Sequence, residues 1–174
     1  TNTVATTIAV GAGPNAFGEF ITPLEPTDSC NGLPATIVGT SGDDELFGTP
    51  GDDVIVGLGG NDIIKSFGGN DTVCGNGGDD KIFNGSGADV VRGGNSDDSI
   101  HGGSGADDLR GGNHDDHIFG GRGNDNLRGN AGDDFLRGGS GEDDLRGGQG
   151  AGDECNGGSD TDVETGCETI VNIP

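Results

Sequence analysis

The sequence has little of what a globular core is built from. Its 174 residues include no Met, Trp or Tyr, aromatic residues make up 4% of it, and hydrophobic residues make up 28%. So little apolar surface does not offset the roughly 1–2 kcal/mol of backbone entropy that each residue loses on folding. An ordinary enzyme core is excluded, and low hydrophobicity with high net charge indicates disorder by itself. The chain is therefore unfolded, or it gains its stability from another source.

Positive charge is also scarce. Eight Lys and Arg residues stand against 31 Asp and Glu residues, which gives a formal net charge of −23. This charge repels the phosphates of nucleic acids and anionic membrane surfaces. The longest apolar-leaning stretch, residues 4–10, is far shorter than the roughly 20 residues that a membrane-spanning helix requires. We therefore expect no nucleic-acid partner and no membrane span.

Glycine, in contrast, is abundant, with 40 residues, and it marks an internal repeat. From Gly39 to Arg146 the chain divides into twelve consecutive nine-residue units without an insertion. The sixth place is Asp in every unit, and the eighth place is Leu, Ile or Val in every unit. A disordered low-complexity segment would not keep two places this constant, so disorder is expected only for a metal-free state.

The composition of one unit predicts its local structure. Gly at the first, second and fourth places permits the positive φ angles and close backbone approach of a tight turn. The last three places suit a short strand whose middle side chain points inward. Coils stacked about 4.8 Å apart would align these side chains into a continuous dry ladder. Two units are expected to close one coil, because a flattened tube needs one strand on each face.

The units closely resemble the RTX family, the haemolysin-type calcium-binding repeats with the pattern G-G-x-G-x-D-x-U-x. The resemblance implies an all-β fold, a right-handed parallel β-roll with two nonapeptides per coil. A short N-terminal β arm and a disulfide-closed C-terminal cap are expected to flank it. We expect residues 1–38 to form the arm and a degenerate first repeat, residues 39–155 the roll, and residues 156–174 the cap.

The two ends of the array are less regular. In residues 30–38, Ile37 falls at the eighth place while Ala35 replaces the Asp. Residues 147–155 are interpreted as a thirteenth unit, in which Gly152 replaces the Asp and Glu154 replaces the apolar residue. The cap is needed because a bare last coil exposes its core and its strand edges.

Calcium takes about six to eight oxygen ligands, and turns that carry Asp and glycyl carbonyls offer them. The resemblance implies that each ion lies between turns on one side of the roll. Six turns on each side leave five gaps, so we expect about ten ions or more, with a charge that nearly cancels −23. Turn preference alone would let Asn and Ser share the sixth place. The predicted ligands form two ladders, Asp44, Asp62, Asp80, Asp98, Asp116 and Asp134, and Asp53, Asp71, Asp89, Asp107, Asp125 and Asp143.

Two other places vary more. The fifth place holds five Asp and one Asn on the side of the Asp44 ladder, and a mixture of Asp, Asn, Ala and Glu on the other side. We expect the side with more carboxylates to hold its ions more tightly. Ser96 and His114 replace Gly at the fourth place on this same side, which puts the geometry of their turns in doubt.

The ninth place is expected to face outward. Phe47, Phe83 and Phe119 share this place on one predicted sheet, with Phe135 nearby. A bare aromatic row is costly, so the N-terminal arm or another molecule is expected to cover it. Six cations also occupy the ninth place and are interpreted as a solvated face, namely Lys65, Arg92, Arg110, Arg128, Arg137 and Arg146.

The four cysteines favour two disulfides. Cys155 with Cys167 would close the C-terminal cap, and Cys30 with Cys74 would clip the N-terminal arm to an early coil. Four cysteines allow three sets of pairings, so the others stay open. Bridged cysteines and the lack of an apolar signal segment favour a mature protein in an oxidising, extracellular or cell-surface setting.

Catalytic signals are weak. No Ser or Cys nucleophile has a His base placed by a known motif, and His114 with His117 is interpreted as an incidental surface pair and not a transition-metal site. We expect no enzyme, but a secreted calcium-binding structural protein that serves as a rod, surface-layer or filament subunit. The alternative is a calcium-dependent folding, adhesion or secretion module of a larger extracellular assembly.

The ends of the roll predict a further partner, a second copy of the chain. The arm at residues 4–10 is rich in β-branched residues that have no place in the nonapeptide register. Head-to-tail stacking with N-terminal strand addition would satisfy both open ends and would propagate as a filament. The competing expectation is an arm folded back over its own phenylalanine row.

Overall fold

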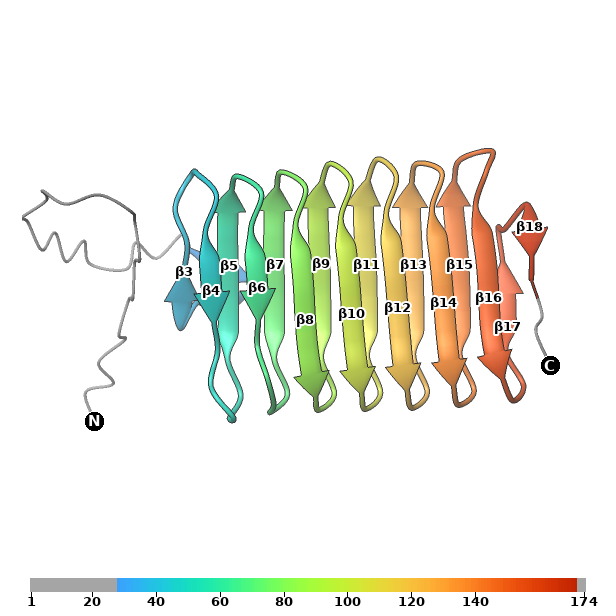
Figure 1. The fold of residues 1–174 in the computed structure, drawn as a ribbon, viewed down its shortest axis with the longest axis horizontal. Coiled ribbons are helices and arrows are strands. Elements are labelled where there is room, and N and C mark those ends of the chain that lie inside the picture. The colour runs from blue at the N-terminus through green and yellow to red at the C-terminus, as the bar shows by residue number, and fades with distance from the viewer. Residues whose placement is uncertain (1–27, 172–174) are drawn as a thin grey trace, which may run out of the picture.

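The computed structural model describes residues 28–171, which form two parallel eight-stranded sheets packed face to face (Figure 1). From β3 on, the odd-numbered strands form one sheet, here named the odd sheet, and the even-numbered strands form the other, the even sheet. The odd sheet contains β3 (Ile37–Val38), β5 (Val54–Gly59), β7 (Thr72–Gly77), β9 (Val90–Asn95), β11 (Asp108–Asn113), β13 (Asn126–Ala131), β15 (Asp144–Gln149) and β17 (Val163–Thr165). The even sheet contains β4 (Glu45–Phe47), β6 (Ile63–Lys65), β8 (Lys81–Ser86), β10 (Ser99–Ser104), β12 (His117–Arg122), β14 (Phe135–Ser140), β16 (Glu154–Ser159) and β18 (Thr169–Ile170).

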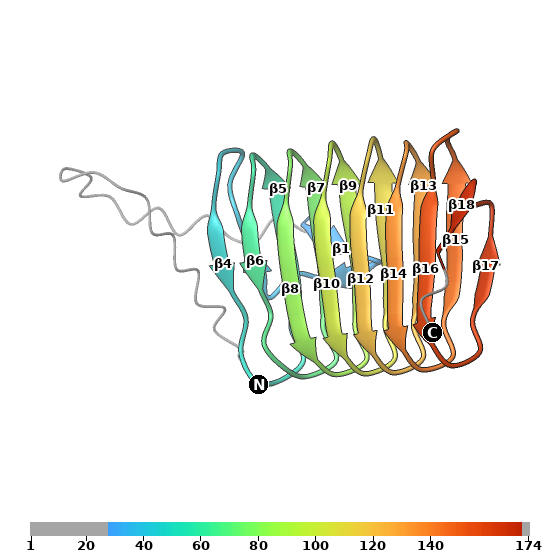
Figure 2. The same ribbon diagram turned by 45° about the vertical axis from the view of Figure 1, so that its right-hand side comes forward.

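The register of the sheets confirms that two nonapeptides close one coil. Ile100 pairs with Ile82 on one side and with Ile118 on the other, and each step is 18 residues. Consecutive units therefore alternate between the sheets, and every second unit stacks in register. The chain forms an all-β parallel β-solenoid, whose strands follow one another along a single axis in both views (Figures 1 and 2). Among the described residues, no helix is long and apolar enough to cross a membrane.

The strands are longer than the three residues predicted for them. Most have six residues and run from the seventh place of one unit to the third place of the next. The reason lies in the first-place glycine, which continues the inward–outward alternation after the buried eighth-place residue. The sequence pattern suggested a turn at this glycine, whereas the structure places it inside the strand.

The core is a single row of aliphatic side chains in each sheet, as predicted. The eighth-place residues from Ile55 to Leu145 have none of their surface exposed, and Leu46 is 6% exposed. They join into one continuous cluster that ends at Cys155. One apolar residue per unit suffices because each side chain packs on the equivalent residues of the neighbouring coils.

The glycines of the turn have two different functions. From the third unit to the twelfth, second-place and fourth-place glycines have positive φ, for example 110° at Gly103 and 137° at Gly105. First-place glycines such as Gly93 do not appear among the positive-φ residues, which corrects the prediction for that place. Ser96 and His114 adopt φ of 82° and 75° at the fourth place, so these two turns keep the geometry that the sequence put in doubt.

The N-terminal end of the described chain lies on the odd sheet. β1 (Ser29–Cys30) and β2 (Leu33–Pro34) form an antiparallel pair, and Cys30 is bonded to Cys74 of β7. Ile37 pairs with Ile55 and packs against the core, which confirms its place in a degenerate first unit. The strand predicted for residues 4–10 lies outside the described residues.

The C-terminal end corrects the interpretation of the thirteenth unit. One inserted residue shifts the register, so Asp153 takes the aspartate place and Cys155 pairs with Leu136 in the core. Gly152 and Glu154 therefore do not stand at the places assigned to them. The next unit contributes β17, in which Glu164 pairs with Leu145 at the eighth place. The disulfide between Cys155 and Cys167 closes this end, as predicted.

Candidate metal centre

The sixth-place aspartates lie inside the turns and bind one coil to the next. The backbone N–H of each of them donates a hydrogen bond to Oδ1 of the equivalent aspartate 18 residues later, as from Asp80 to Asp98 at 2.8 Å. Twelve such bonds, between 2.8 and 3.0 Å long, continue through the inserted residue to Asp153 and Asp162. The structure thus brings all twelve predicted aspartates into two ladders and adds one residue to each.

The second carboxylate oxygen of most of these aspartates has no partner. Oδ2 is buried and accepts no hydrogen bond from any described residue in eleven of them, namely Asp62, Asp71, Asp80, Asp89, Asp98, Asp107, Asp116, Asp125, Asp134, Asp143 and Asp153. A buried carboxylate oxygen without a partner is strongly unfavourable. A row of such oxygens therefore indicates a cationic ligand in the turns.

First-place glycines create the space that these oxygens face. A Cβ atom on Gly93 would overlap Oδ2 of Asp98 and lie 2.9 Å from the carbonyl oxygen of Gly111, one coil further on. The equivalent overlap with the unit's own aspartate recurs along both ladders, for example at Gly120 and Asp125. The space thus combines a carboxylate oxygen and a glycyl carbonyl, which are the hard oxygen donors that calcium prefers.

Burial and like charge act on the same carboxylates. The pKa of Asp98 is raised to about 7 and that of Asp116 to about 8, by burial as the largest cause and also by the charges of neighbouring aspartates. The backbone hydrogen bond to Oδ1 acts in the opposite direction. The turns are therefore costly to ionise unless a cation neutralises them.

The fifth-place side chains form a second, outer ladder, in which Asp and Asn side chains accept a hydrogen bond from the following coil and not from the preceding one. Oδ1 of Asn61 accepts from the backbone N–H of Asp79 at 2.9 Å, and Oδ1 of Asp115 accepts from that of Asp133 at 2.8 Å. Both Asp and Asn supply this acceptor, which explains why the two residue types share the fifth place. These side chains are exposed in most units.

The first two turns differ from the others. Oδ2 of Asp44 accepts from the N–H and the hydroxyl of Thr40, and Oδ2 of Asp53 accepts from the same groups of Thr49, at 2.5 to 2.9 Å. Threonine at the second place therefore satisfies the carboxylate that the later turns leave unpaired. Asp44 and Asp53 belong to the ladders by position, but they are the least dependent on a cation.

Side chains alone do not complete a metal site. Within residues 28–171, no three or more His, Cys, Asp or Glu residues gather around one point. Backbone carbonyls must supply the remaining ligands, as the sequence led us to expect. His114 accepts a hydrogen bond from the N–H of Ser96 at its turn, and His117 packs edge-on against Phe135, so the two do not form a pair.

The comparison with known families agrees with this geometry. The RTX calcium-binding nonapeptide repeat matches residues 36–64, 47–82, 68–91, 83–118, 92–127 and 119–154. The chain belongs to this family. Its RTX repeats bind calcium, and the buried aspartates are the feature of the structure that fits such an ion. A search of curated proteins finds no match to the chain.

Sequence reasoning missed two members of the ladders. Asp153 and Asp162 continue the RTX turns beyond the twelve regular units, which end at Arg146, and a single insertion before Asp153 hid them. The signal was present in the glycines at 157 and 158 followed by Asp162, which restore the repeat pattern after the insertion.

Proposed function

We propose that this chain is an extracellular structural protein, a rod whose coils calcium holds together, and that it has no catalytic role. The row of buried, unpaired Oδ2 atoms carries the proposal. Their charge opposes folding, and a divalent ion between successive turns would convert this repulsion into attraction. The twelve sixth-place aspartates supply the carboxylate ligands, and the glycyl carbonyls supply the others.

The two ladders, each extended by one aspartate to seven turns, have six gaps each, so about twelve ions would fill the gaps between successive turns. Their charge would leave a chain of −23 close to neutral. In the eleven aspartates with an unpaired Oδ2, Oδ1 keeps its bond to the preceding coil, while Oδ2 remains free for the ion. Each of these carboxylates would thus bind the preceding coil through Oδ1 and the ion through Oδ2. Stacking of the coils and binding of the ions would then occur together.

The two disulfides support an oxidising location, since such bonds persist mainly outside the cytosol. They tie down both ends of the solenoid, where a coil has a neighbour on one side only. This arrangement suits a protein that must stay folded in extracellular fluid.

Calcium-coupled folding is tested by circular dichroism of the disulfide-reduced chain. We expect a largely unstructured spectrum in chelator and a β-rich spectrum in excess calcium, with magnesium as the control ion. The same β signal in chelator and in calcium would contradict the proposal.

A filament is the assembly that we propose for the rod. The terminal strands β3 and β17 each have one paired edge and one edge free of described strands, and a second copy can add there head-to-tail. We expect light scattering and electron microscopy to show calcium-dependent filaments that disappear when residues 1–29 are deleted. A full-length chain that stays monomeric in calcium at high concentration would instead favour a module of a larger extracellular assembly.

A further inference from the structure

The outer face of the even sheet carries a groove that runs across its strands. From Gly85 onward its floor consists of second-place glycines with positive φ, a conformation that favours Gly, whereas Phe67 takes the equivalent place one coil earlier with φ of 73°. These glycines stand at the same height on successive strands, at Gly85, Gly103, Gly121, Gly139 and Gly158. The ninth-place side chains form one wall, and the third-place side chains form the other.

Aromatic rings stack along the ninth-place wall. The ring of His101 lies 5.0 Å from that of Phe83 and 4.8 Å from that of Phe119, measured between centroids. Phe135, at the seventh place of β14, lies 5.8 Å from Phe119. Nδ1 of His101 is buried and has no hydrogen-bond partner among the described residues, so the imidazole serves as another flat ring in this wall.

The opposite wall is polar. It contains the third-place residues Ser86, Ser104, Arg122, Ser140 and Ser159. The hydroxyls of Ser104 and Ser140 are 3.4 and 3.5 Å from the nearest carbonyl acceptors, which are long hydrogen bonds that a ligand can replace. The groove therefore places flat apolar surfaces on one side and hydroxyl groups on the other.

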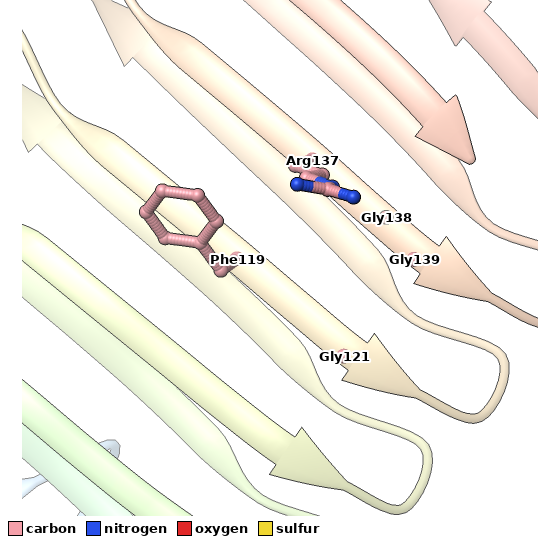
Figure 3. Close-up of a pocket in the computed structure, with 5 residues that line it drawn as sticks. All are labelled: Phe119, Gly121, Arg137, Gly138 and Gly139. Carbon is pink, nitrogen blue, oxygen red and sulfur yellow. The ribbon is translucent and has the colours of Figure 1, made fainter. Parts of the chain in front are cut away.

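The groove deepens into a hollow of about 250 Å³ between β12 and β14. Phe119 and Arg137 stand side by side on these strands, and Gly121, Gly138 and Gly139 line the hollow beside them (Figure 3). Arg137 makes no salt bridge within residues 28–171, unlike Arg110 and Arg146 on the odd sheet.

The local charge here is opposite to that of the whole chain. β10, β12 and β14 contain no acidic residue and carry Arg122 and Arg137, in a chain with a net charge of −23. Within these three strands, an anion therefore meets arginine side chains and no carboxylate.

We propose that this groove binds a linear acidic polysaccharide along the roll axis. A sugar ring stacks on Phe119, its carboxylate pairs with Arg137, and the serine wall hydrogen-bonds to hydroxyls of the following sugars. Rings at the ninth place of three successive strands, Phe83, His101 and Phe119, suit a chain of repeating sugars better than a single small molecule. The site depends on the calcium ladder only through the fold.

The described N-terminal residues leave this face open. The disulfide of Cys30 with Cys74 holds β1 against the odd sheet, on the opposite side of the roll. The amide oxygen of Asn31 also accepts from Arg92 there, at 2.8 Å. Residues 28–36 thus lie away from the phenylalanine row. The strand of the N-terminal arm that the sequence predicts as a cover for this row, residues 4–10, lies outside the described residues.

The test is isothermal titration of the full-length chain in calcium with hexagalacturonate, and with its methyl ester as a neutral probe of the same backbone. We expect binding of the acid and at least about tenfold weaker binding of the ester. Arg137→Gln and Phe119→Leu should each weaken binding about tenfold. Arg146→Gln, the same change at the ninth place of the odd sheet, should leave binding unchanged.

Three outcomes would overturn the proposal. No binding by the full-length chain would mean that the groove is covered or does not recognise acidic sugars. Equal affinity for the acid and the ester would exclude recognition by Arg137. Binding of the acid that survives both Arg137→Gln and Phe119→Leu would place the oligosaccharide elsewhere, for instance on calcium at the turns. Circular dichroism in calcium shows independently whether each variant is folded.

Discussion

Replacing Asp107 with Asn separates the charge of a ladder aspartate from its hydrogen bond. Oδ1 of Asp107 accepts from the N–H of Asp89 at 2.9 Å, and an amide oxygen can take over this function. Oδ2 is buried without a partner, and burial raises the pKa of Asp107 to about 7. The substitution therefore keeps the contact between coils but removes the carboxylate that a calcium ion would bind.

The neighbouring residue provides a matched control. Asp108 points outward, where its carboxylate pairs with Arg110 at 2.8 Å. Asp108→Asn removes the same charge from the same unit and breaks an ion pair of a kind worth about 0–1 kcal/mol. The two variants thus differ in whether the lost carboxylate faces the inside of a turn.

The size of the effect follows from ligand linkage. A site with calcium at 100 times its dissociation constant stabilises the folded chain by about 2.7 kcal/mol. Asp107 adjoins two gaps of its ladder, toward Asp89 and toward Asp125. We expect Asp107→Asn to lose about 3 kcal/mol of unfolding free energy if one ion is lost, and about 5 kcal/mol if both are lost.

Urea unfolding at several calcium concentrations measures this loss. The slope of the unfolding free energy against the logarithm of calcium concentration reports the number of ions released on unfolding. It should fall by one or two ions in Asp107→Asn and stay constant in Asp108→Asn. Equal slopes in the two variants would refute the assignment of the ladder as the calcium site.

Three further predictions concern pH, the core and the cap. In chelator, the pKa of Asp116, which burial and like charge raise to about 8, means that the folded chain binds protons more tightly than the unfolded chain. The β signal in circular dichroism should therefore be greatest near pH 4 and should be lost as the pH rises to 8; a β signal that increases with pH in chelator would contradict this reasoning. In calcium, Ile100→Ala should lower the free energy of unfolding by about 2–5 kcal/mol, because it leaves a cavity in the single-row core. Ser99→Ala, on the outer face, should lower it little, and urea unfolding of the two variants makes the comparison. Intact mass after alkylation without reduction should show no free thiol, since both disulfides are formed. Changing both Cys155 and Cys167 to Ser should make the C-terminal coil the first part of the chain that a protease cleaves.

Most of the fold could be predicted because two places of the nonapeptide have strict physical requirements. An inward aliphatic residue such as Ile100 fixes the face of each strand, and the invariant aspartate fixes the turn. Together they define the 18-residue coil without any tertiary information. The length of the strands was not predictable in this way. Glycine at the first place suggested a turn, but it lies within the strand and is required because a side chain there would overlap the aspartate.

The features of the candidate site that could not be predicted are those set by the geometry of the side chains. The sequence identified Asp98 and its equivalents, but not that Oδ1 is committed to the preceding coil while Oδ2 is free. It also gave no sign that Thr40 and Thr49 satisfy the first two carboxylates. His101 was overlooked because the phenylalanine row was considered at intervals of 36 residues, and the imidazole lies between two of its members.

The alternation of units between the two sheets has a consequence for how such a chain can change its length. Loss of 18 residues removes one whole coil and leaves both outer faces as they were, whereas loss of nine residues would transfer every later unit to the opposite face. The arginine row of the odd sheet, from Arg92 to Arg146, would then continue into the aromatic row of the even sheet. Duplication and deletion in this gene are therefore expected to preserve function in steps of two units. Single-residue insertions are tolerated near an end, as at residues 147–156, because a turn absorbs the extra residue there and only one coil follows it.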